Sequence, residues 1–287
     1  MLRSLQSKLK LDYRSYIVAS ANTASIAKTA EYRAVRAELK KEQPDNIALH
    51  GFKAYSQNDE DGIIAAIFSR IPHNRTFVEV GVQNGRECNS HLLLIDGWRG
   101  AWIEASSQMC ALIRAELGKG EFPGRFRLVE DFARPDNAQA LYRDACRFLD
   151  VSEIDLFSLD IDGNDLFVLE RLLDAGCRPG VLCLEYNAAF PPPMRVSVEF
   201  AEDRSWAYDD YYGASLQALA DVCERNNYRL LTCSIVGSNA FFIREDLAGA
   251  FNLRPIEELW QPLRTGITSL PGGHAPTLKF LRDALYR

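Results

Sequence analysis

The sequence predicts an α/β fold built on a mostly parallel, seven-stranded sheet. From about residue 56 onward, short apolar runs that suit strands alternate with longer segments that suit helices. The strand candidates are apolar without a break, as strands are when helices cover both faces of a parallel sheet. A composition of 47% hydrophobic and 25% charged residues also fits a globular protein with a packed core.

The first five strand candidates are bounded by turn-forming or helix-capping residues, and one helix candidate lies in each gap between them. Gly97 and Gly176 follow two of these helices, at the place where a helix commonly ends. The strands are expected at residues 76–80, 101–103, 126–129, 154–161 and 181–186, and the helices at 89–96, 107–117, 135–149 and 165–175. An earlier helix runs through Ile63, Ile64, Ile67 and Phe68, with Ser56 or Asp59 as its cap.

The regular alternation stops after the fifth strand. Residues 187–213 form a long insertion rich in proline and aromatic side chains, and insertions of this kind tend to be functional. A helix over 215–226 follows, and then a β-hairpin over 228–233 and 240–243. The hairpin places an antiparallel strand at the C-terminal end of the otherwise parallel sheet.

The chain divides into an N-terminal helical extension (1–50), a core (51–245) and a C-terminal extension (246–287). Residues 25–41 are rich in Ala, Glu, Lys and Arg, which favour a helix, and Pro44 ends it. We expect this helix to pack on the core or to form a homo-oligomer, with a mobile tail as the alternative. We expect loops and short helices in the C-terminal extension.

Composition narrows the classes of partner. A net charge of −6 argues against nucleic acid, whose binding draws on clustered Lys and Arg. The seven cysteines are scattered without a C-x-x-C pair, as expected of buried thiols in a reducing compartment. No apolar run has signal-peptide length or the ~20 residues of a membrane span. We therefore expect a cytoplasmic protein that contacts no membrane and acts on a small molecule.

The first strand ends in Glu79 and a Gly81-x-x-x-Gly85 turn into the next helix. Glycines at such a turn let the backbone approach a ligand closely. A dinucleotide-binding turn would have a glycine for the pyrophosphate where Gln83 stands, which disfavours a nicotinamide-dependent oxidoreductase. The spacing fits a nucleoside ligand without pyrophosphate, of which S-adenosylmethionine is the common example.

Two acids follow at the ends of the next strands. Glu104 ends the second strand, where a carboxylate can accept hydrogen bonds from both hydroxyls of a ribose. Asp131 follows the third strand, at the edge of the sheet where adenine is usually bound. The alternatives are a helix cap for Glu104 and an ordinary loop acid for Asp131.

The fourth strand ends in the acidic run Asp160-Ile161-Asp162-Gly163-Asn164-Asp165. Asp160 and Asp162 are candidates for a general base or for ligands of a Mg²⁺ ion. Asp165 is expected to cap the next helix. Further catalytic candidates are His91, the histidine nearest to the glycine turn, and Glu185 at the end of the fifth strand.

Together, six segments resemble the FkbM-type methyltransferases, in a less characterised branch of that family. They are Tyr55-Ser56-Gln57-Asn58-Asp59-Glu60-Asp61-Gly62, Phe77-Val78-Glu79-Val80-Gly81, Gly97-Trp98-Arg99-Gly100, the acidic run 160–165, Glu185-Tyr186-Asn187 and Asn239-Ala240-Phe241-Phe242. The resemblance covers roughly residues 51–245 and implies a Rossmann-like class I methyltransferase sheet. It also implies adenosylmethionine as the methyl donor and O-methylation of a sugar or natural product.

The sequence therefore predicts an adenosylmethionine-dependent methyltransferase of a small-molecule hydroxyl. The alternatives are a catalytically inactive binding module of the same fold and, further away, the nicotinamide-dependent oxidoreductase. Acceptor contacts are expected from Asn187 and from Trp206, Tyr208, Tyr211 and Tyr212 of the insertion. The expected cofactor contacts are Gln57, Glu79, Gly81, Gly85, Glu104, Asp131 and Asp160.

Overall fold

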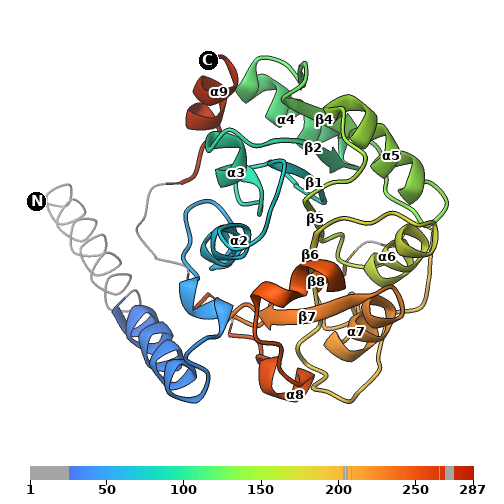
Figure 1. Ribbon diagram of the computed structural model, residues 1–287. Coiled ribbons are helices and arrows are strands. Elements are labelled where there is room, and N and C mark those ends of the chain that lie inside the picture. The colour runs from blue at the N-terminus through green and yellow to red at the C-terminus, as the bar shows by residue number, and fades with distance from the viewer. Residues whose placement is uncertain (1–25, 203, 205, 208, 265, 269–274) are drawn as a thin grey trace, which may run out of the picture.

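In the computed structural model, residues 26–202, 204, 206–207, 209–264, 266–268 and 275–287 are described. Their strands form one sheet in the order β3-β4-β2-β1-β5-β6-β8-β7 (Figure 1). The strands are β1 (Thr76–Val80), β2 (Arg99–Glu104), β3 (Glu121–Phe122), β4 (Phe126–Glu130), β5 (Leu156–Leu159), β6 (Val181–Glu185), β7 (Tyr228–Cys233) and β8 (Asn239–Arg244).

The five central strands β4, β2, β1, β5 and β6 are parallel to one another, whereas β8 pairs antiparallel with both β6 and β7. The predicted mostly parallel sheet with a C-terminal antiparallel hairpin is confirmed. One strand was not predicted. Strand β3 pairs antiparallel with β4 through only two residues, too few for a hydrophobic pattern to show in the sequence.

Helices cover both faces of the sheet, and each face has its own hydrophobic core (Figure 1). Strand β1 serves both, because Val78 packs with α5, α6 and α7 while Phe77 packs on the opposite side with α2, α3, α4 and α9. Both side chains are fully buried, which stabilises the fold by about 1.5 to 3 kcal/mol for each. The α-helices are α2 (Glu60–Phe68), α3 (His91–Ile95), α4 (Ser107–Leu117), α5 (Ala138–Leu149), α6 (Asp165–Asp174), α7 (Leu216–Arg225), α8 (Ile256–Leu259) and α9 (Lys279–Leu285), and the 3₁₀ helices are η1 (Ile47–His50) and η2 (Glu245–Ala250).

The helix ends follow local sequence signals in part. Gly97 and Gly176 adopt positive φ angles of 86° and 76° just beyond α3 and α6, as predicted. Asp59 is the residue before α2, but its side chain makes no capping hydrogen bond. The hydroxyl of Ser56 instead accepts a hydrogen bond from the Asp61 N–H at 3.2 Å, inside the first turn.

Both extensions reach the core. A helix covers residues 26–42, and the Tyr32 hydroxyl donates a 3.2 Å hydrogen bond to Asp59 while Leu39 is buried. At the other end, α9 packs against α3 and α4, and Arg125 donates to the carbonyl of Ala284 at 2.9 Å. Within the described ranges, no helix has the length and apolar character needed to cross a membrane.

Candidate functional site

Two adjoining pockets lie at the carboxyl ends of the parallel strands. Pocket A, of about 210 Å³, lies beyond the ends of β1, β2, β4 and β5. Pocket B, of about 880 Å³, extends from β5 and β6 towards the insertion and the C-terminal extension. Gln83, Asp160, Asp162 and Trp206 line both pockets, so a molecule in one would meet a molecule in the other across these residues.

The glycine turn forms one wall of pocket A. Gly81 has a φ of +87°, and a Cβ atom there would lie 1.6 Å from the carbonyl oxygen of Asp160, so only glycine fits. Gln83 also adopts a positive φ, of 49°, and lines the pocket. Gly85 is required for a different reason, because a Cβ there would lie 2.5 Å from the Trp102 ring. Gly85 faces that ring and does not line pocket A.

Glu104 is held in place at the end of β2. Its Oε2 atom accepts from the N–H of Gln83 at 2.7 Å, and its Oε1 atom accepts from the N–H of Ser106 at 2.8 Å. A carboxylate has about four acceptor sites, so two remain for a ligand in pocket A. Asp131 lines the same pocket, and its N–H donates to the Glu104 carbonyl at 3.1 Å.

Glu79 lies behind the glycine turn and lines neither pocket. Its carboxylate accepts hydrogen bonds from the N–H groups of Asn89 and Ser90, at 2.7 and 2.8 Å, and from the Ser90 hydroxyl. Burial raises the pKa of Glu79. Glu79 therefore holds the residues just before α3, and its direct contact with a cofactor stays a prediction.

His91 also lines neither pocket. The ring is completely buried and stacks on Tyr55, with the ring centroids 3.9 Å apart. Neither ring nitrogen has a hydrogen-bond partner among the described residues, and burial lowers the pKa of His91 to about 4. Because His91 lines neither pocket, the geometry does not support its predicted catalytic role.

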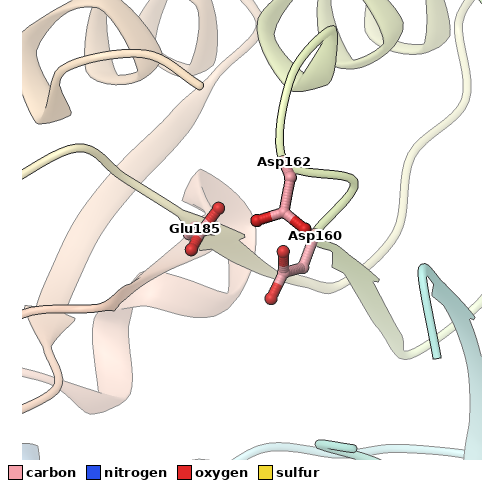
Figure 2. Close-up of side chains that lie close together, drawn as sticks. All are labelled: Asp160, Asp162 and Glu185. Carbon is pink, nitrogen blue, oxygen red and sulfur yellow. The ribbon is translucent and has the colours of Figure 1, made fainter. Parts of the chain in front are cut away.

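Asp160, Asp162 and Glu185 form a carboxylate trio where the two pockets meet (Figure 2). One oxygen from each lies within 4.8 Å of one from each of the others. No N–H or hydroxyl group in the described part of the chain donates a hydrogen bond to any of the three. Such a cluster must share protons or bind a cation, because close carboxylates cannot all stay ionised cheaply.

Burial and mutual repulsion raise the pKa values of the trio. Burial is the largest cause for all three acids, and it raises the pKa of Asp162 alone. For Asp160, repulsion by Asp162 raises the pKa further, and for Glu185 repulsion by Asp160 does so. The trio is therefore a site where a proton can be accepted at a higher pH than by ordinary carboxylates.

The loop after β5 differs from the sequence-based expectation in two ways. Asp162 adopts a positive φ of 55°, although a glycine follows it, and Asp is one of the few residues that tolerate such an angle. Asp165 was expected to cap α6, but it is the first residue of that helix. Its carboxylate accepts from the N–H groups of Ile161 and Gly163, both at 2.8 Å, and so closes the loop.

The insertion supplies walls for both pockets. Trp206 lines both, and its indole N–H donates to the Asp209 carbonyl at 2.7 Å. Tyr212 lines pocket B, and burial followed by repulsion from the trio raises its pKa to about 12. Tyr211 is 51% exposed and lines neither pocket, while Tyr208 lies outside the described residues.

Asn187 was predicted to contact the acceptor and Gln57 to contact the cofactor. The Asn187 amide is buried and donates to the carbonyls of Asp210 and Tyr212 at 2.9 and 3.1 Å, so it anchors the insertion without lining a pocket. Gln57 lines pocket B and not pocket A. A cofactor in pocket A would therefore contact Gln57 only if it extended past Gln83 into pocket B.

Several lining residues were missed in the sequence. Arg204 and Phe132 line pocket A, and Ser238, Leu263 and Gly266 line pocket B. The position of Gln83, inside the glycine turn, was a signal that could have identified it as a lining residue. The residues from the C-terminal extension carry no such signal, because only the folded chain brings them beside Gln57.

No protein-family model matches this chain, and no curated protein matches it by sequence. Solved structures similar to it include an O-methyltransferase from Bacillus cereus in complex with SAH, at 15% identity and a TM-score of 0.41, covering 76% of this chain and 89% of that one. A methyltransferase from Clostridium acetobutylicum, described as S-adenosylmethionine-dependent, is similar at 9% identity and a TM-score of 0.40, with 75% and 99% covered. The glycopeptide N-methyltransferase MtfA with bound SAH gives 11% identity and a TM-score of 0.41, with 67% and 89% covered.

Proposed function

We propose that this protein is an adenosylmethionine-dependent methyltransferase that acts on a hydroxyl of a small molecule such as a sugar. The observation that carries the proposal is the pair of adjoining pockets, which meet at partly buried carboxylates to which no described N–H or hydroxyl group donates. Methyl transfer needs such an arrangement, because donor and acceptor must be aligned on either side of one reacting centre.

The lining of pocket A fits the cofactor. Gly81 leaves space against the Asp160 backbone, and Glu104 keeps two acceptor sites at the end of β2 for the hydroxyls of a ribose. Asp131 and Phe132 form the wall beyond Glu104, where an adenine can lie. When bound, adenosylmethionine supplies an electrophilic methyl group on a sulfonium centre.

The trio would act on the acceptor in pocket B. A hydroxyl placed between Asp160 and Glu185 can give its proton to either carboxylate as its oxygen takes the methyl group. The raised pKa values of both acids make either one a stronger base than an ordinary carboxylate. Trp206 and Tyr212 would cover the acceptor and exclude water.

The same three acids fit a divalent cation. Mg²⁺ prefers oxygen ligands, and Glu185 adds a third carboxylate to the pair predicted from the sequence, Asp160 and Asp162. An ion held there would lower the pKa of a bound hydroxyl. Chelation separates the two routes: loss of turnover in EDTA and its recovery with magnesium or manganese assign the metal route, and turnover indifferent to EDTA assigns direct proton transfer.

A thermal shift assay tests the cofactor assignment. A ligand at 100 times its dissociation constant stabilises the folded state by ~2.7 kcal/mol. We expect adenosylmethionine and adenosylhomocysteine to raise the melting temperature and NAD to leave it unchanged. Stabilisation by NAD alone would favour the oxidoreductase. Cofactor binding without methyl transfer into any acceptor of an extract from the native host would favour the inactive binding module.

A further inference from the structure

The second pocket is strongly acidic. Five of its described lining residues carry carboxylates, and none is Lys, Arg or His. A ligand with a negative charge would be repelled, and a ligand with a positive charge would be attracted more strongly than a neutral sugar. From this lining we propose that the acceptor carries a protonated amine, as an amino sugar does, and that Asp209 and Asp210 bind it. The inference rests on the proposed methyltransferase function and narrows its substrate class.

The carboxylates of Asp209 and Asp210 have acceptor sites that can bind a cation. Neither forms an ion pair with a Lys or Arg in the described part of the chain. Asp209 uses one oxygen to accept from the Tyr211 N–H at 3.1 Å, and the backbone carbonyls of both residues are held by Trp206 and Asn187. The backbone is thus fixed while the carboxylates stay exposed and open to pocket B.

A second, independent feature is the pair of aromatic rings beside these acids. Trp206 and Tyr212 both line pocket B, with their ring centroids 6.2 Å apart and their planes inclined at 63°. The faces of Trp and Tyr attract ammonium groups, and the attraction grows when the cation is desolvated. Carboxylates next to aromatic faces are therefore suited to an ammonium ion in a way that either feature alone would not be.

A cation at the trio would not remove this preference. Deeper in the pocket, the Oε2 atom of Glu185 is buried without a hydrogen-bond partner, so the trio also takes either a proton or a cation. A magnesium ion held there would still leave Asp209 and Asp210 uncompensated. The amine has a recognition role only, because a protonated nitrogen has no lone pair to accept a methyl group. The accepting atom stays the hydroxyl that faces the trio.

Three monosaccharides that differ in charge test the inference. Glucosamine, glucose and glucuronate are compared by ligand-observed NMR with the full chain saturated with adenosylhomocysteine. We expect glucosamine to bind at least about tenfold more tightly than glucose, and glucuronate to bind most weakly. The D209N/D210N double variant, which keeps the side-chain shapes, should lose the preference. The matched control Glu257→Gln, an exposed acid on α8 outside both pockets, should keep it.

The outcomes separate the inference from the function on which it rests. Equal binding of the three sugars, no binding of any, or a preference that survives in the double variant would overturn the inference. Adenosylhomocysteine affinity, measured on the same samples by calorimetry, tests the function. Its presence without a preference for glucosamine would leave the methyltransferase proposal standing, and its absence would overturn both.

Discussion

Two clusters of closely spaced acids in the described part of the chain differ in the hydrogen bonds that other groups donate to them. In the first, Asp59, Glu60 and Asp61 at the start of α2 are almost wholly buried and accept many hydrogen bonds. Asp61 alone accepts from three backbone N–H groups, those of Ala54, Tyr55 and Ser56, at 2.7 to 2.8 Å. No N–H or hydroxyl group of the described residues donates to the trio, in which Asp160 and Glu185 hydrogen-bond to each other. Buried acids with donors hold a fold together, whereas acids without donors are left for a substrate, a proton or a cation.

The remaining acids of the first cluster join distant segments. Glu60 accepts from the Asn58 N–H at 2.8 Å and from the Asn239 amide at 2.9 Å, which ties α2 to the β7–β8 hairpin. Asp59 accepts from the Tyr32 hydroxyl and from the Ile235 N–H, at 3.2 and 3.3 Å. The segment 55–62 that carries the family resemblance is thus largely a structural motif in this molecule.

The largest effect is expected in the first cluster. Asp61→Ala leaves three backbone N–H groups, one buried and two partly buried, without their acceptor and removes one of the two acceptors of the Ser56 hydroxyl, which should lower the free energy of unfolding by on the order of 3 kcal/mol. Glu185→Ala is the matched control, because no described N–H or hydroxyl group donates to its carboxylate, and its stability should be unchanged or higher. Chemical denaturation measures both. Equal losses in the two variants would erase the distinction between the clusters.

The trio should show the opposite pattern. Asp160→Asn and Glu185→Gln keep the side-chain shapes and remove the base, so turnover should fall by about a hundredfold or more. Stability and adenosylmethionine affinity should stay close to those of the unchanged protein. A double variant should lose little more than either single one, because the two acids act as one unit. Near-normal turnover in both single variants would remove the trio from the chemistry.

The trio also predicts a pH dependence. Because the pKa values of Asp160 and Glu185 are raised, these acids become protonated at a higher pH than ordinary carboxylates. The ionised base is then lost as the pH falls, and turnover should fall with it. A pH–rate profile that is flat through the acid range where ordinary carboxylates titrate would contradict this assignment.

A smaller effect is expected at Glu104. Glu104→Ala removes a charged hydrogen-bond acceptor and should weaken adenosylmethionine binding by about 1 to 3 kcal/mol, measured by calorimetry. Glu79→Gln is an instructive comparison, since Glu79 is also a glutamate near the end of a central strand but lines neither pocket. In Glu79→Gln, the affinity for adenosylmethionine should change less than the free energy of unfolding. A reversed pattern would return Glu79 to the cofactor site.

The smallest effects separate two aromatic residues of the insertion. Trp206 lines both pockets, so Trp206→Ala should weaken cofactor binding and raise the Michaelis constant of the acceptor. Each change should correspond to a free-energy loss of about 1 kcal/mol. Tyr212→Phe should affect only the acceptor, because Tyr212 lines pocket B alone. Steady-state kinetics combined with calorimetry checks both. Loss of stability without either effect would mean that these rings only pack the insertion.

The sequence predicted the layers of this fold well because each strand and helix carries its own periodic pattern. Strand β1, helix α4 and strand β7 begin and end where residues 76–80, 107–117 and 228–233 were predicted. The carboxyl ends of the strands also located Glu104, Asp160 and Glu185, because parallel strands bring their ends to one edge of the sheet.

Side-chain direction could not be predicted in the same way. Glu79 is the last residue but one of β1 and Glu104 is the last residue of β2, yet Glu79 turns to the N–H groups just before α3 and Glu104 to pocket A. His91 was expected near the cofactor because it is close in sequence to the glycine turn, but α3 points it into the core beside Tyr55. The C-terminal wall of pocket B depends on tertiary packing that leaves no local pattern.

The most direct test is a crystal structure of the protein with adenosylhomocysteine. The proposed function predicts the nucleoside in pocket A, with both ribose hydroxyls within hydrogen-bond distance of the Glu104 carboxylate and the sulfur facing Asp160 and pocket B. A nucleoside bound elsewhere, or one whose sulfur points away from the carboxylate trio, would contradict it.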